Sequence, residues 1–272
     1  HRDLHSFPTR RSSDLYWDQA SGANFYRTSY SSDFSSPVDV YGTSYSPSSV
    51  LADGQHTLYV RAHDLAGNYS APTNKSVSVD KTAPAITIIT GTFVANIATP
   101  TQTINFNGVA GVVSDSGTGA TGVKTTTWSQ YPSGSTLSFG SPGSLQTTVS
   151  ASADGTYIVQ LRVEDNAGNV SYAYLTFIRD LTAPGTPTAS GSTQTPSLRP
   201  TWTWTSGGGG TGTYKYRLST YGAGGTVVQD WTTVIGVTSY QPASNIADVT
   251  TFSFEVMEQD QNGNWSNPGT FV

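Results

Sequence analysis

The 272-residue sequence has no cysteine, one methionine and four histidines. Without cysteine the chain can form neither disulfides nor thiolate metal sites, and its redox compartment cannot be inferred from thiols. Charged residues are also scarce, at 11% of the chain, and the net charge is −5. A mildly acidic chain without basic clusters argues against nucleic acid and anionic membranes as partners. The sequence has no apolar run long enough for a membrane span.

The first 15 residues do not resemble natural protein sequence. Residues 1–15 read HRDLHSFPTRRSSDL, which looks like the in-frame translation of a short-read sequencing adapter. We therefore expect this segment to be an artefact that is not native, and we exclude it from fold prediction. An adapter joined to Tyr16, and an end at Val272 inside what reads as a last strand, indicate a fragment of a longer protein.

One pattern occurs three times in the rest of the chain, at residues 58–70, 159–171 and 254–266. Each copy is a stretch of alternating apolar and polar residues, then an aspartate, then a turn that ends in Gly-Asn. The alternation is typical of a half-buried strand. Asp-x-x-Gly-Asn favours a tight hairpin because Gly and Asn tolerate positive φ. The copies lie about 100 residues apart, which is the size of one immunoglobulin-like β-sandwich.

Two similar linkers separate the copies, VDKTAP at residues 79–84 and RDLTAP at residues 179–184. Proline keeps the residue before it extended, so we expect short, stiff junctions. Thr-Ser-Tyr-x-Pro followed by Ala-Asp recurs in the first and last parts of the chain, which indicates two modules of one type with a second type between them. The predicted modules are a truncated one at residues 16–84, a second at residues 85–184, and a third at residues 185–272 that is truncated in its last strand.

The repeated DxAGN turn and the DxTAP linkers resemble the tandem immunoglobulin-like and fibronectin type III-like repeats of large bacterial surface proteins. The middle module, with DGTYIVQLRVEDNAGN at residues 154–169, is similar to a PKD (polycystic kidney disease-like) domain. This resemblance implies an all-β fold of tandem antiparallel Ig-like β-sandwiches, of the fibronectin type III and PKD types, in an elongated array. The composition agrees, because Thr, Ser, Gly, Val and Tyr are plentiful and no segment has a helical period.

The residues for catalysis are missing. Outside residues 1–15 the histidines are His56 and His63, and their odd spacing on one strand places them on opposite faces. The second and third modules contain no histidine, so a Ser-His-Asp arrangement cannot be built there. We therefore predict that the chain is not an enzyme.

The resemblance implies a non-catalytic region, extracellular or at the cell surface, that acts as a stalk or spacer or in adhesion. Its expected partners are neighbouring modules of the chain and a host or cell-surface protein or glycan. The alternative is a set of accessory, carbohydrate-binding modules of a secreted polysaccharide-degrading enzyme. An intracellular scaffold is a third and more distant alternative.

Calcium is the one cofactor that the sequence suggests, because acidic and amide oxygens lie close to both linkers. A bound ion would stiffen the array by bridging adjacent modules. No D-x-D-x-D cluster supplies the six to eight oxygens that calcium takes, and the alternative is that these acids cap turns by hydrogen bonding. The candidate ligands at the two junctions are Asp80 with Asp64 or Asn68, and Asp180 with Asp165 or Asn169.

Aromatic residues give a second candidate binding site, in the third module. Trp202 and Trp204 share one face of a strand, and with Trp231 they could form a flat platform for sugar stacking. A sandwich core also commonly holds large aromatics, so core positions are favoured for Trp202 and Trp204, as for Trp128 in the second module. The residues that remain as candidate glycan contacts, if they are exposed, are Tyr216, Tyr221 and Trp231.

Two glycine-rich segments, residues 114–122 and 206–212, lack the Lys-Ser/Thr ending of a phosphate-binding loop. No helix is expected after either segment. We predict that both are flexible connections between strands.

Overall fold

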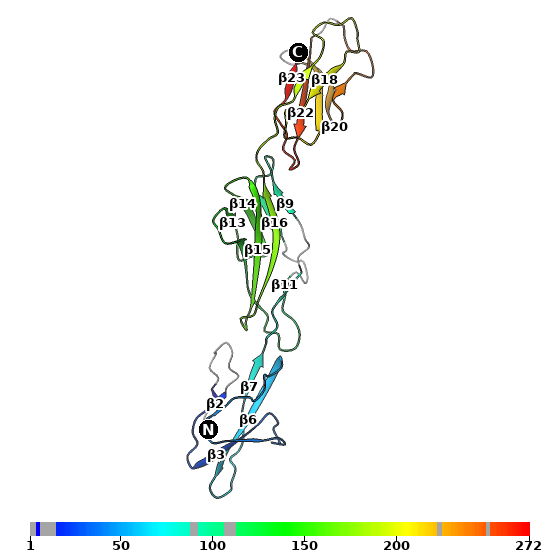
Figure 1. Cartoon of the computed structure of the whole chain (residues 1–272). Helices are drawn as coiled ribbons and strands as arrows, with labels where there is room; N and C mark the ends of the chain where they lie inside the picture. Colours follow the sequence, from blue (N-terminus) through cyan, green and yellow to red (C-terminus); the bar gives the residue numbers. More distant parts are fainter. Residues whose placement is uncertain (1–3, 6–14, 88–91, 106–112, 222–224, 249–250) are drawn as a thin grey trace.

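The computed structural model describes residues 4–5, 15–87, 92–105, 113–221, 225–248 and 251–272. The described residues form β-strands and no helix, which confirms the predicted all-β fold. The strands form three modules that follow one another in an elongated row (Figure 1). Each module has its own cluster of buried apolar side chains. None of the described segments forms a helix that could cross a membrane.

The first module contains β1 (Leu4–His5), β2 (Leu15–Trp17), β3 (Ala23–Ser29), β4 (Val38–Val40), β5 (Ser44–Tyr45), β6 (Gly54–Asp64) and β7 (Thr73–Val79). These strands make a three-stranded sheet in the order β1-β2-β5 and a four-stranded sheet in the order β4-β3-β6-β7. Trp17, Tyr26, Leu58 and Val60 are buried in its core. Leu15, the last residue of the segment that looks foreign, is buried with them.

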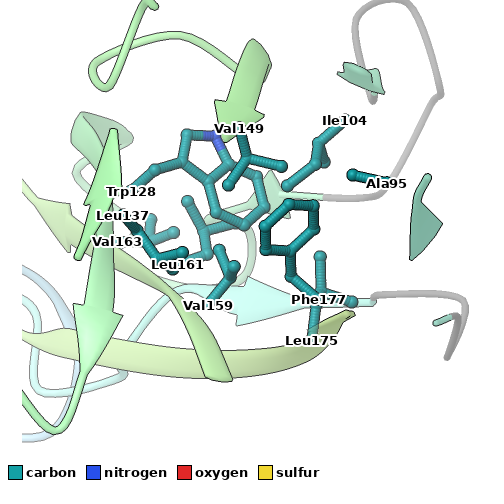
Figure 2. Packing of buried hydrophobic residues seen from close by; sticks show 10 residues of the cluster. All are labelled: Ala95, Ile104, Trp128, Leu137, Val149, Val159, Leu161, Val163, Leu175 and Phe177. Carbon is teal, nitrogen blue, oxygen red and sulfur yellow. The ribbon is translucent and has the colours of Figure 1, made fainter. Parts of the chain in front are cut away.

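The second module contains β8 (Ala85–Ile86), β9 (Thr92–Ala95), β10 (Gln102–Asn105), β11 (Val113–Ser114), β12 (Val123–Tyr131), β13 (Leu137–Phe139), β14 (Gln146–Ala151), β15 (Gly155–Asp165) and β16 (Val170–Arg179). The sheet β12-β15-β16-β9 packs against the smaller sheet β10-β14-β13, and β11 pairs with β8. Figure 2 shows side chains of both sheets meeting around Trp128, which is 2% exposed and takes the core position expected of it. Val159, Leu161 and Val163 alternate along β15 and are fully buried, as their spacing predicts.

The third module contains β17 (Thr188–Ser190), β18 (Trp202–Thr205), β19 (Thr213–Thr220), β20 (Val227–Ile235), β21 (Ser239–Tyr240), β22 (Phe252–Gln259) and β23 (Gly269–Phe271). Its sheets, β17-β18-β21 and β20-β19-β22-β23, have the same strand order as those of the first module. The register agrees too, because Leu15 pairs with Tyr45 as Trp202 pairs with Tyr240. The first and third modules are therefore of one type, and the second differs.

The repeated turn has the same geometry in all three modules. Its glycine has positive φ, at 91° for Gly67, 94° for Gly168 and 89° for Gly263, where a side chain would be strained. The aspartate before it accepts the backbone N–H of the asparagine after it at 2.8, 2.8 and 2.9 Å. The same asparagine donates its side-chain amide back to the aspartate at 3.0, 2.8 and 2.9 Å. This exchange closes each turn and fixes the direction of the asparagine side chain.

Candidate functional site

The first linker is held from the module before it by the aspartate of an Ala-Asp-Gly sequence. Asp53 accepts hydrogen bonds from the Thr82 hydroxyl at 2.7 Å and from the Lys81 backbone N–H at 3.1 Å. Asp53 lies beside the linker because Gly54, at the start of β6, pairs with Val79, at the end of β7. These bonds, the Thr82 hydroxyl first, lower the pKa of the Asp53 carboxyl below its ordinary value.

The second linker repeats this arrangement at Asp154. Its carboxylate accepts the Thr182 hydroxyl at 2.8 Å and the Leu181 backbone N–H at 3.1 Å, and it also pairs with Arg179. Gly155 pairs with Arg179, so the register is that of the first junction. The Thr182 hydroxyl and then the Leu181 N–H lower the pKa of the Asp154 carboxyl.

Each linker is also held from the module after it, by the asparagine of the repeated turn. At the first junction the side-chain amide of Asn169 donates to the carbonyl oxygens of Asp80 at 3.1 Å and Thr82 at 3.4 Å. At the second junction Asn264 donates to the carbonyls of Asp180 at 3.0 Å and Thr182 at 3.4 Å. Each Asp-x-Thr segment is therefore clamped on both sides, and we call this arrangement the junction clamp.

The first junction has further contacts from the glycine-rich segment 114–122. The Thr121 hydroxyl and backbone N–H donate to the Asp80 carboxylate at 2.7 and 3.0 Å. A Cβ added at Gly119 would lie 2.3 Å from the backbone nitrogen of Gly54 and 2.4 Å from the carbonyl oxygen of Val79. The loop of the second module therefore packs directly on the backbone of the first. This segment connects β11 to β12, as predicted, and it also forms part of the junction; its flexibility stays a prediction.

The second junction is built from different residues. The Asn262 side-chain amide donates to the Asp180 carboxylate at 2.8 Å, and the Asn96 amide donates to the Asn262 carbonyl at 3.0 Å. The backbone N–H of Ile97 donates to the side-chain oxygen of Asn264 at 2.7 Å. The loop after β9 in the second module thus reaches the turn of the third.

The pairing predicted for the candidate calcium ligands is wrong. Asp64 ends the 11-residue strand β6, whereas Asp80 lies beside the start of that strand, about 33 Å away along an extended chain. Asp64 therefore bonds Asn68 within its own turn. Asp180 is separated from Asp165 by β15 in the same way and meets Asn262 and Asn264 instead. A hairpin brings a linker to the start of its long strand, so the partner turn belongs to the next module.

One acidic cluster does form, at the first junction. Carboxylate oxygens of Asp80, Asp115 and Asp165 lie within 4.8 Å of one another. The Oδ1 atom of Asp115 is buried, and no described residue offers it a hydrogen bond. At the second junction the Asp180 carboxylate accepts the side-chain amide of Asn262. Asp115 was not a sequence candidate, because nothing along the chain links it to Asp80 and Asp165.

Comparison with known families gives one match within the chain. Residues 95–178, most of the second module, match the family model described as K319L-like, PKD domain. The second module is similar to a PKD domain. The chain is thus a tandem array of all-β modules with a PKD-like module in the middle, and the match supports a non-catalytic repeat region. Among proteins with curated descriptions, none matches the chain.

Solved structures similar to the chain include the FN1-FN3 domains of chicken CNTN1, at 13% identity and a TM-score of 0.36, covering 98% of this chain and 95% of that one. Fibronectin(III)-like modules of CbhA from Clostridium thermocellum match at 11% identity and a TM-score of 0.38, covering 69% of this chain and 90% of that one. The PKD domain from KIAA 1837 protein matches at 14% identity and a TM-score of 0.28, covering 40% of this chain and 98% of that one.

The aromatic candidates of the module after the PKD-like one are not gathered on one surface. Trp202 and Trp204 are core residues, at 5% and 3% exposed, as favoured from the sequence. Tyr216 is also buried, at 9% exposed, because it packs against Tyr240 and Phe254, so this candidate glycan contact is wrong. The two candidates that are exposed are Tyr221 at 63% and Trp231 at 37%.

A cation lies against Trp231. The Lys215 ammonium is 5.2 Å from the Trp231 ring centre and 4.4 Å from that of Trp265, the residue after the turn asparagine. In the first module Arg27, on the corresponding strand, lies 5.2 Å from the ring centre of Tyr69, and Arg61 lies 4.1 Å from it. Such cation–π contacts stabilise the outer face of the four-stranded sheet in these two modules.

The two histidines lie in separate environments. The ring of His63 stacks on Phe25 at 4.3 Å and meets Tyr69 edge-on. The Nε2 atom of His56 is 2.7 Å from the Ala52 carbonyl oxygen. In the PKD-like module Tyr157 makes the equivalent bond to Ala153 at 2.8 Å. Both histidines therefore have structural contacts within the first module.

The residues that sequence reasoning missed are those that bind the linkers from the upstream side. Asp53 and Asp154 each stand in an Ala-Asp-Gly sequence directly before the longest strand of their module. The recurrence of this triplet was the signal that could have found them. Thr121 had none, because its partner Asp80 is 41 residues away in another module.

Proposed function

We propose that the chain is a stiff, non-catalytic stalk or spacer of a bacterial surface or secreted protein. The observation that carries this proposal is the junction clamp, in which both linkers are bonded from the module before and from the module after. In this role the region lies outside the cell and holds an adhesive segment away from the surface. Its partners along the stalk are the neighbouring modules of the same chain.

The clamp should limit bending, because its hydrogen bonds must break before a junction can bend. At the first junction the linker makes two bonds to the upstream Asp53, and its two carbonyls share the one amide proton of Asn169 that is not donated to Asp165. The proline that follows each Asp-x-Thr-Ala segment restricts the backbone further. Bent arrangements that break the clamp are therefore expected to be minor states.

Distances between spin labels test the stiffness. Because the chain has no cysteine, introduced cysteines would be the only labelling sites. Tyr41→Cys with Tyr172→Cys spans the first junction, and Tyr172→Cys with Ile235→Cys spans the second; all three side chains are exposed. A stiff stalk gives one narrow distance distribution across each junction. Broad distributions across both junctions would overturn the proposal.

A second role, as accessory modules of a secreted polysaccharide-degrading enzyme, is supported by the exposed rings of Tyr221 and Trp231. Aromatic rings with a polar edge suit ligands that have both apolar and hydroxylated faces. Binding of the full chain to a glycan array, lost in Trp231→Ala and retained in Tyr172→Ala, would favour this role. An array without binding would leave the stalk as the function.

We also propose that calcium strengthens the first junction, through Asp80, Asp115 and Asp165. The buried Oδ1 of Asp115 has no described partner, and an unpaired buried anionic oxygen is costly. A divalent cation would satisfy it, with water completing the coordination. Added calcium should raise the unfolding temperature by several degrees in the native sequence, and a chelator should reverse the rise. Equal unfolding temperatures with calcium and with chelator, in the native sequence and in Asp115→Asn, would overturn the calcium proposal alone.

A further inference from the structure

We infer that the turn of the first module, from Asp64 to Asn68, is a docking site for an extended Asp-x-Thr segment at the C-terminal end of another Ig-like module. This inference rests on the proposed stalk function. It names the partner of a third turn that resembles the two turns that bind linkers. The two occupied turns, at Asn169 and Asn264, show what such a segment looks like when bound.

The three turns are the same at the atoms that matter. Asn68, like Asn169 and Asn264, donates its backbone N–H to one carboxylate oxygen of its aspartate and its side-chain amide to the other. In the second and third modules the same amide nitrogen also reaches two linker carbonyls, at 3.1 and 3.4 Å and at 3.0 and 3.4 Å. The aspartate therefore orients the amide before any linker is bound.

In the first module, no described linker residue contacts this amide. Among the residues that the structure describes, Asn68 Nδ2 donates to Asp64 alone, although an amide NH2 has two protons to donate. Asn68 is exposed, whereas Asn264, which holds a linker, is 2% exposed. The turn lies at the far end of the hairpin of β6 and β7, away from the second module (Figure 1).

The chemistry of the two occupied sites specifies the partner. The amide donates to two backbone carbonyls that are two residues apart. Such carbonyls lie on the same side of an extended segment. That segment is held extended by an upstream aspartate, which binds the threonine hydroxyl and the intervening N–H, as Asp53 and Asp154 do. The fitting partner is therefore a module that carries Ala-Asp-Gly before its long strand and Asp-x-Thr after its last one.

A graft within the chain tests the inference. Leu15 stands where Trp202 stands in the third module, since each pairs with the tyrosine of Thr-Ser-Tyr. A second copy of residues 85–201, fused to the N-terminal side of Leu15 instead of residues 1–14, would carry the linker Asp180-Leu181-Thr182 to the turn with its native spacing. Hydrogen exchange of the Gly67 and Asn68 backbone amides should slow by about five- to tenfold relative to the ungrafted chain.

Two further variants make the result decisive. Asn68→Ala in the grafted chain should restore fast exchange and broaden the label distance across the new junction. A shorter graft of residues 180–201 alone should still slow exchange at the turn, which covers the case in which the longer graft does not fold. Unchanged exchange in both grafts, with narrow label distances retained across the two native junctions, would overturn the inference and leave the stalk standing. Broad distances at the native junctions would instead count against the stalk.

Discussion

The side-chain amide nitrogen of Asn169 lies 3.1 Å from the carbonyl oxygen of Asp80, a residue 89 positions earlier in the chain. Asn264 and Asp180 repeat this relationship at 3.0 Å across 84 positions. The turn near the end of each module therefore reaches back to the linker that precedes that module. As a result, the link between two modules is complete only when the downstream module has folded.

Removing the amide should loosen one junction at a time. In Asn169→Ala the linker loses the amide proton that the Asp80 and Thr82 carbonyls share, and the turn loses the bond to Asp165. We therefore expect a broader label distance between Tyr41→Cys and Tyr172→Cys, and roughly 1–3 kcal/mol less stability in the second module. The distance across the second junction should not change. Asn68→Ala is the matched control, because it removes the turn bond where the described residues make no linker contact. Equal broadening in the two variants would contradict the clamp.

Adding one methyl group at Gly119 should disrupt the contact between the first two modules. Gly119 has φ of 82°, and an added Cβ would lie 2.3 Å from the Gly54 backbone nitrogen. We expect Gly119→Ala to displace the loop and lengthen or broaden the label distance across the first junction. Gly122→Ala, with φ of 84° and its nearest neighbouring atom at 3.8 Å, carries similar backbone strain without the close contact and should leave that distance unchanged.

Acid should weaken both clamps from the upstream side. The pKa values of Asp53 and Asp154 are lowered in the folded chain, mainly by the Thr82 and Thr182 hydroxyls. A carboxyl with a lowered folded pKa stabilises the fold above its ordinary value of 3.8 and loses this contribution as the pH falls through the lowered value. Label distances should therefore be narrow at neutral pH and broaden below 3.8. Asp53→Asn should make the first junction less dependent on pH while the second keeps its response.

Each module should unfold independently, because each has its own hydrophobic core. Trp128 is 2% exposed and lies in the cluster of the PKD-like module. Trp128→Ala should cost about 3–5 kcal/mol, which lowers the unfolding temperature of a module of this size by more than about 10 °C. Calorimetry should show one transition shifted and the others within a few degrees of their original positions. Trp204→Ala should instead shift a different transition, and a common shift of all transitions would show a single cooperative unit.

Whether the burial of a candidate binding residue could be predicted depends on how far apart in the sequence its contacts lie. The spacing of Trp202 and Trp204 placed them on one face of a strand, and the core was favoured because sandwich cores commonly hold large aromatics. Tyr216 could not, because its burial depends on Tyr240 and Phe254, which come from other strands. The local pattern specifies which residues share a face of a strand, but only the packed sheets decide whether that face is covered.

The sequence by itself determined the strands, the turns and the number of modules. Alternation along residues 157–165 and the positive φ of Gly67, Gly168 and Gly263 depend on neighbouring residues in the chain, so local chemistry is sufficient. Only the tertiary structure decided that Asp80 meets Asn169, Thr121 and Asp115, and not Asp64. A hairpin separates the two ends of its long strand by the full length of that strand, and contacts between modules join residues that no local pattern relates.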